Sequence, residues 1–70
     1  MSELNTDLPS VRFIQSLIRD KTRIEAKLVT GDTLHGRITW QDIHALRLIT
    51  DVEEVFVIQF HALAYLKNLS

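Results

Sequence analysis

The spacing of apolar residues changes once along the chain, from a helical period to the two-residue alternation of strands. Over about 9–20 the apolar residues recur three and four positions apart on one face: Phe13, Ile14, Leu17 and Ile18. Pro9 suits the first turn of a helix, where its missing N–H costs nothing, and it keeps Leu8 out of the helical region. This pattern predicts one short helix that must pack its apolar face on something else.

After the helix the alternation is that of β-strands separated by tight turns. Gly31 lies in a predicted turn over 30–33, and the composition of 51–54 predicts another. The predicted strands are 24–28, 34–41, 45–50, 55–60 and 63–67. One helix followed by about five short strands predicts a mainly β fold, a small antiparallel barrel. We expect an extended or disordered segment over 1–8, one domain over 9–67 and a tail over 68–70.

Gly36 stands inside the second predicted strand, where a glycine is unfavourable. It packs no side chain and loses much backbone entropy on folding, although Leu34 and Ile38 on either side continue the strand alternation. Five strands close into a barrel only if some of them bend sharply, and a glycine leaves the concave side of a bend free of a clashing side chain. We therefore expect a sharp bend at Gly36.

The fourth predicted strand, VFVIQF, opens with four apolar residues in a row, so both of its faces are expected to be buried. A barrel with one core buries only one of them. The other face is then covered either by an adjoining strand of a second chain or by the predicted helix. With 70 residues and no cysteine, the chain has a small core and no disulfides, so we expect oligomerisation to supply additional stability.

Composition and charge exclude several classes of function. No apolar run is long enough to span a membrane and the polar start is no signal peptide, which predicts a cytoplasmic protein without membrane insertion. The net charge is −1, but residues 9–47 carry seven basic residues against four acidic ones. A symmetric ring would repeat this basic stretch as a band around its axis, whereas in a monomer it would be an ordinary solvated surface.

The candidate catalytic and metal-binding residues form no recognisable site. The three histidines fall on separate parts of the predicted fold, without a close-spaced pair: His35, His44 and His61. We expect no metal and no cofactor. Asp42 near His44 has no nucleophile or phosphate-binding loop beside it, so we expect no enzymatic activity and interpret Asp42 as a loop organiser that accepts backbone N–H bonds. Trp40, the only tryptophan, is interpreted as a core or interface residue rather than a base-stacking platform.

Several stretches resemble, in their order and spacing, the Hfq family of bacterial Sm-like proteins. The glycine turn, the Leu-x-Gly-x-Ile strand over 34–38 and Asp42 resemble the first half of the Sm signature. The segment FHAL over 60–63 resembles the second half, where the family has a Lys-His pair followed by Ala and Ile. LPSVR, KLVTGD, WQD and AYL are most similar to the cyanobacterial branch. The resemblance, over residues 8–67, implies a strongly bent five-stranded Sm-like barrel, assembled as a homohexameric ring that binds RNA.

The resemblance also implies positions for a uridine-binding site at the pore. The family builds it from a Gln-aromatic pair after the Asp and from the Lys-His pair; the matching residues here are Ile43, His44, Phe60 and His61. The imidazole of His44 can stack on a base, and His61 can donate or accept a hydrogen bond. The missing amide and lysine would each remove about 1–3 kcal/mol of base or phosphate contact. We therefore expect weak uridine binding.

Two further RNA surfaces of the family match altered residues. On the opposite face, which binds adenine-rich RNA, the matching residues are Lys27, Thr30, Gly31 and Asp32. Lys27 replaces a stacking tyrosine and keeps only a phosphate contact, while Asp32 would repel the RNA backbone unless Lys27 neutralises it. The arginine-rich rim of the family corresponds to a reduced patch around Ile18, with candidate residues Arg12, Gln15, Arg19 and Lys21.

The resemblance implies that the fourth and fifth strands join subunits edge to edge, through Val55, Val57, Ile58, Phe60, Leu63 and Tyr65. Two functions remain open from the sequence. One is an RNA chaperone and post-transcriptional regulator that acts on small RNAs and messages with weakened sites. The other is a ring that binds a protein partner, for example in type IV pilus or motility machinery, with which the cyanobacterial branch is associated.

Overall fold

A computed structural model describes residues 8–69. Most of the expected 1–8 segment, residues 1–7, lies outside the described residues. The elements in chain order are α1 (Pro9–Arg19), β1 (Ile24–Leu28), β2 (Thr33–Gln41), β3 (Ala45–Thr50), β4 (Val55–Gln59), the 3₁₀ turn η1 (Phe60–Ala62) and β5 (Leu63–Asn68). The predicted helix and five antiparallel strands are confirmed, with small shifts at their ends. Phe60 lies in η1 rather than in β4, and β5 extends to Asn68.

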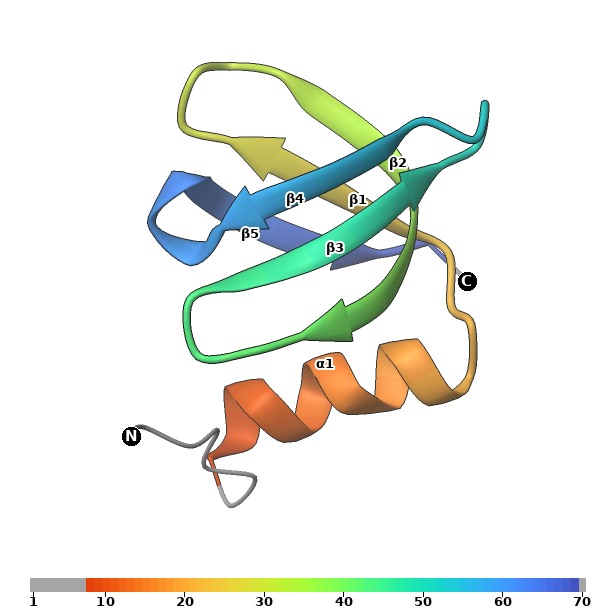
Figure 1. The fold of residues 1–70 in the computed structure, drawn as a ribbon, viewed down its shortest axis with the longest axis vertical. Coiled ribbons are helices and arrows are strands. Elements are labelled where there is room, and N and C mark those ends of the chain that lie inside the picture. The colour runs from red at the N-terminus through yellow and green to blue at the C-terminus, as the bar shows by residue number, and fades with distance from the viewer. Residues whose placement is uncertain (1–7, 70) are drawn as a thin grey trace.

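The five strands form one antiparallel sheet in the order β4-β3-β2-β1-β5. The long strand β2 connects its two halves, since residues 33–36 pair with β1 and residues 36–41 pair with β3. Figure 1 shows β3 and β4 crossing in front of β1 and β5. However, β4 and β5 occupy the two ends of the strand order and do not pair with each other. The expected closed barrel is wrong in this respect, because the sheet of one chain is open and has two free edges.

The core lies between the two halves of this sheet and the helix. Its buried side chains come from every large element except β5: Ile14, Leu17, Ile24, Ala26, Ile38, Leu46, Leu48 and Ile58. The helix α1 packs along β2, as Figure 1 shows at the base of the sheet. The side-chain amide of Gln41, at the end of β2, donates a hydrogen bond to the carbonyl oxygen of Val11 at 3.1 Å. The helix therefore closes one side of the core.

The buried face of α1 differs from the predicted one by part of a turn. Val11, Ile14 and Leu17 are buried, whereas Phe13 is exposed. The helix ends at Arg19 in a Schellman motif, in which the N–H groups of Lys21 and Thr22 donate to carbonyl oxygens of the last turn. Lys21 takes the left-handed conformation of this motif, with φ 52°. The chain leaves the helix in the direction of β1.

Gly36 is the residue at which β1, β2 and β3 meet. It pairs with Ile24 of β1 and with Thr50 of β3. A Cβ at this position would contact the carbonyl oxygen of Ile49 and lie 2.7 Å from the Cα of Thr50. The clash that a side chain would cause is therefore with the backbone of the neighbouring strand.

The strand β4 is largely uncovered within one chain. Val55 is 51 % exposed, Phe56 36 % and Val57 56 %, whereas Ile58 points into the core and is 5 % exposed. Within one chain only one face of this strand is therefore buried, as expected if the other face contacts a second chain. The alternative in which α1 covers the outer face is wrong, since α1 packs on β2. An exposed apolar edge strand is a surface to which another chain can add.

Candidate nucleic-acid interface

The loop between β2 and β3 is held by Asp42. One oxygen of its carboxylate accepts the backbone N–H of His44 at 2.8 Å and that of Ala45 at 2.9 Å. These two hydrogen bonds lower the pKa of Asp42, because they favour its charged form. The backbone N–H of Asp42 donates in turn to the carbonyl oxygen of Ala45 at 2.9 Å. The side chains of Ile43 and His44 are thus presented from a rigid turn.

The turn η1 lies against this loop. The backbone N–H of Phe60 donates to the carbonyl oxygen of His44 at 2.8 Å, which brings together two segments far apart in the sequence. His44 and His61 are exposed. The ring of Phe60 is half-buried and packs against the core, so it contributes to stability as well as lying beside the candidate site. All four residues predicted for the pore face therefore belong to two adjoining segments.

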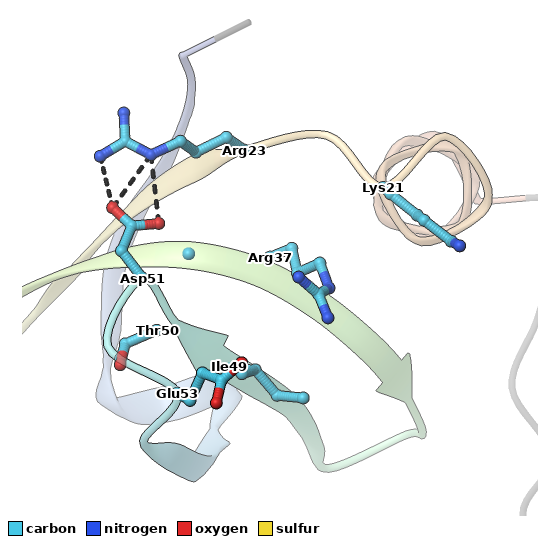
Figure 2. A pocket seen from close by; sticks show the side chains of 8 residues that line it. Lys21, Arg23, Arg37, Ile49, Thr50, Asp51 and Glu53 are labelled. Carbon is cyan, nitrogen blue, oxygen red and sulfur yellow. Dashed lines mark hydrogen bonds and ion pairs between the residues drawn. The ribbon is translucent and has the colours of Figure 1, made fainter.

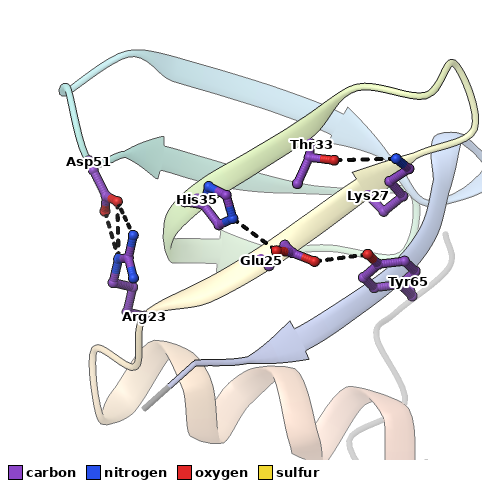
Figure 3. Close-up of polar contacts among 7 residues, drawn as sticks. All are labelled: Arg23, Glu25, Lys27, Thr33, His35, Asp51 and Tyr65. Carbon is purple, nitrogen blue, oxygen red and sulfur yellow. Dashed lines mark hydrogen bonds and ion pairs between the residues drawn. The ribbon is translucent and has the colours of Figure 1, made fainter.

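The outer face of β1, β2 and β5 carries a polar network across three strands (Figure 3). The Nε2 atom of His35 lies 2.9 Å from one carboxylate oxygen of Glu25, and the Tyr65 hydroxyl donates to the other at 2.8 Å. The hydrogen bond with His35 lowers the pKa of Glu25 most, and the hydrogen bond from Tyr65 lowers it further. The same contact with the Glu25 carboxylate raises the pKa of Tyr65. The side chain of Tyr65, predicted at the subunit interface, is therefore engaged on this face.

The residues predicted for adenine-rich RNA surround the turn between β1 and β2. Gly31 takes φ 100°, which favours glycine, and the Thr30 hydroxyl donates to the Asp32 carboxylate at 2.8 Å. The Lys27 ammonium lies 3.4 Å from the hydroxyl of Thr33 and forms no ion pair with Asp32. Asp32 is therefore not neutralised by Lys27, so this turn keeps a negative charge where an RNA backbone would pass.

The predicted rim residues are separated in the structure. Gln15 and Arg19 line a hollow of about 330 Å³ together with Ile18, Thr39, Trp40 and Gln41. Arg19 also forms an ion pair with Asp20 at 3.1 Å. Lys21 lies in a different hollow, and Arg12 lines neither of them. Trp40 is 39 % exposed, so the sequence-based interpretation missed its place in the wall of a surface hollow.

These surfaces carry exposed rings and charged side chains that can bind nucleic acid. Within residues 8–69, no three His, Cys, Asp or Glu side chains are placed to hold a metal ion. Over the same residues, no helix has the length and apolarity needed to cross a membrane. Exposed imidazole and indole rings can stack on bases, and the Arg19 guanidinium, which lines the same hollow as Trp40, can contact a phosphate.

Comparison with known proteins places the chain in a family. A sequence profile described as Hfq related matches residues 8–68. An Hfq protein from Anabaena sp. is 41 % identical, and the match covers 87 % of this chain and 97 % of that one, with a TM-score of 0.78. The chain belongs to the Hfq family. The identity to the Anabaena protein also confirms the predicted similarity to the cyanobacterial type.

A second Hfq structure shares the fold at low sequence identity. The crystal structure of a pleiotropic translational regulator, Hfq, is 16 % identical and has a TM-score of 0.78, with 83 % of this chain and 95 % of that one covered. No functionally curated protein matches this chain. The Hfq fold thus persists where most side chains differ, so the surfaces of this Hfq-type chain have to be judged from its own residues.

A second hollow was not foreseen from the sequence. It is lined by charged residues from separate segments of the chain: Lys21, Arg23, Arg37 and Glu53 (Figure 2). No local motif joins these residues, because they meet only where β1, β2 and β3 cross at Gly36. In this Hfq-type chain, then, candidate binding residues extend beyond those predicted by the resemblance.

Proposed function

We propose that this Hfq-type chain is an Sm-like RNA-binding protein, an RNA chaperone that regulates small RNAs and messages after transcription. The observation that carries the proposal is the hydrogen bond from the Phe60 N–H to the His44 carbonyl oxygen, at 2.8 Å. It brings together the two segments that carry the exposed imidazoles of His44 and His61, and Asp42 holds the first of these segments. In a ring, each subunit would contribute this pair around the pore.

We further propose that the ring is a homohexamer joined through β4 and β5. The support is physical: these are the two unpaired edges of the sheet, and β4 exposes Val55, Phe56 and Val57. Backbone pairing of β4 with β5 of the next subunit would satisfy both edges and cover that apolar strip. The residues proposed at this interface are Val55, Val57, Ile58, Phe60, Leu63 and Tyr65.

The uridine site at the pore is proposed to be weak. Ile43 and Phe60 are half-buried and offer neither an amide nor a cation to a base or a phosphate. Binding then rests on stacking against His44 and a hydrogen bond from His61 in each subunit. Because few phosphates are neutralised per subunit, affinity should change little with salt.

A protein-binding ring is the second candidate. It is favoured by the unneutralised Asp32 on the face where Lys27 would meet RNA. Such a ring would use the same subunit contacts, with a protein in place of RNA, for example a component of motility machinery. The two candidates differ in whether the purified protein binds RNA at all.

Fluorescence anisotropy with labelled hexauridine tests the proposed function. A His44→Ala/His61→Ala double variant should bind at least about tenfold more weakly than wild type, since stacking on one base is worth about 1–3 kcal/mol. His35→Ala is the matched control, because His35 contacts Glu25 on another part of the surface. It should bind as wild type does.

Equal affinity of the double variant and wild type would contradict the proposed pore site. If wild type binds neither uridine-rich nor adenine-rich oligomers at low salt, the RNA function is wrong and the protein-binding ring becomes the better account.

A further inference from the structure

A second hollow, of about 250 Å³, opens where the end of α1, the start of β1, the middle of β2 and the β3–β4 turn come together. Figure 2 shows charged side chains from all of these segments around it. Those that matter for its chemistry are Lys21, Arg23, Arg37, Thr50, Asp51 and Glu53. The hollow lies apart from His44 and His61, neither of which lines it.

Only some of the charged side chains in this hollow form ion pairs with one another. The guanidinium of Arg23 donates to both carboxylate oxygens of Asp51, with its Nε atom 3.2 Å from one oxygen and 3.0 Å from the other. This contact lowers the pKa of Asp51. The side chains of Lys21, Arg37 and Glu53 have no hydrogen bond or ion pair within residues 8–69. Three cations and two carboxylates leave the lining with a charge of +1.

The backbone at two of these residues is in a conformation that favours glycine. Lys21 has φ 52° and Glu53 has φ 64°, and they are the only non-glycine residues with positive φ within 8–69. Lys21 occupies the position of the Schellman motif that is usually glycine, and Glu53 lies in the turn between β3 and β4. Both lysine and glutamate are sterically less favourable than glycine there. The backbone conformation at these two positions therefore does not require a charged side chain, and the side chains present supply the hollow with two of its unmatched charges.

We propose that this hollow binds one phosphodiester group of single-stranded RNA. The inference rests on the proposed RNA-binding function; of the residues of this hollow, only Lys21 was predicted from sequence to contact RNA, and the site adds Arg37 and Glu53. Lys21 and Arg37 would contact the non-bridging phosphate oxygens, and Glu53 would accept a hydrogen bond from a ribose 2′-hydroxyl. The single negative charge of a diester matches the +1 lining, whereas a terminal phosphate carries about −1.5 to −2. A 2′-hydroxyl contact is also the feature by which a protein distinguishes RNA from DNA.

The test combines affinity with stability. Lys21→Gly should raise the melting temperature, because glycine is preferred at this helix end, and should also weaken binding of labelled hexauridine. Arg37→Gln should weaken binding and lower the salt slope by about 0.7 for each subunit engaged. Lys67→Gln is the control, since it removes the same charge from an exposed lysine that lines neither hollow. Its effect should be clearly smaller.

Two further binding experiments test which chemical groups of the ligand the hollow recognises. Glu53→Gln should reduce the preference for hexauridine over its 2′-deoxy counterpart, since the carboxylate acceptor is weakened. The dinucleotide UpU should displace the labelled oligomer at a lower concentration than uridine 5′-monophosphate at matched ionic strength, because only UpU contains a phosphodiester. Equal displacement by the two compounds would overturn the assignment to a phosphodiester.

The outcomes separate this inference from the proposed function. If His44→Ala/His61→Ala weakens binding but Arg37→Gln behaves as Lys67→Gln does, the hollow is not an RNA site, and the proposed function stands. If Lys21→Gly raises the melting temperature without any loss of affinity, the role of Lys21 is wrong. If wild type binds no RNA, both proposals are overturned.

Discussion

Replacing Gly36 by valine should prevent stable folding, although valine is the better strand former. The new Cβ would contact the Ile49 carbonyl oxygen and lie 2.7 Å from the Thr50 Cα, and both are backbone atoms. They cannot turn aside as a side chain can, so β3 would have to separate from β2. Overpacking a core with side chains costs about 1–3 kcal/mol, and displacing a strand costs more. A core of this size supplies only about 3–5 kcal/mol.

Thermal unfolding followed by circular dichroism measures this effect, with Gly31→Val as the matched control. A Cβ at Gly31 has nothing within 4 Å, but φ is 100°, so only the strained backbone conformation costs energy. That cost is about 1–2 kcal/mol. Gly31→Val should therefore melt at a lower temperature than wild type and remain folded at 25 °C. If Gly36→Val melts at or above the temperature of Gly31→Val, the account of the strand crossing is wrong.

A Val57→Asp substitution should convert the proposed ring into smaller species. Val57 is 56 % exposed on the edge strand β4, so the single chain tolerates a charge there. In the ring, the carboxylate would be buried against the next subunit without a partner, at a cost of several kcal/mol at each interface. Ile58→Asp would be less informative, because Ile58 is 5 % exposed and its loss would damage the core directly.

Val52→Asp is the control for this prediction. Val52 is 75 % exposed and lies in the turn before β4, off the paired edge. Analytical ultracentrifugation should show a ring for wild type and for Val52→Asp, and monomers or unfolded chains for Val57→Asp. A Val57→Asp protein that keeps the mass of wild type would exclude β4 as the subunit contact.

Much of the fold could be predicted because its signals are local. The alternation along β1 and β3 and the glycine turn at Gly31 depend only on neighbouring residues. The buried face of α1 was partly misjudged for the opposite reason. Phe13 and Val11 both extend an apolar stripe through Ile14 and Leu17, and only the position of β2 decides which of them is buried. Closure of the sheet likewise depends on whether β4 and β5 meet, which no local pattern determines.

In the candidate site, too, the features that depend on neighbouring residues could be predicted, and those that depend on packing could not. The hydrogen bonds of Asp42 follow from its own turn, so its role could be expected from sequence. The contact between His44 and Phe60 required the family resemblance, since the two segments are distant in the chain. The hollows lined by Trp40 and by Lys21 depend on how the helix end and β2 pack. Such placements are properties of the three-dimensional fold and have no signature in spacing.

The central claim is that this chain forms a ring that binds single-stranded RNA. Sedimentation velocity of wild-type protein with dye-labelled hexauridine, followed at the absorbance of the dye, tests assembly and binding together. At low salt the dye should sediment with a species of about six times the 8.1 kDa of one chain. Dye that sediments as free oligomer at every salt concentration, beside protein that sediments as a monomer, would contradict the account.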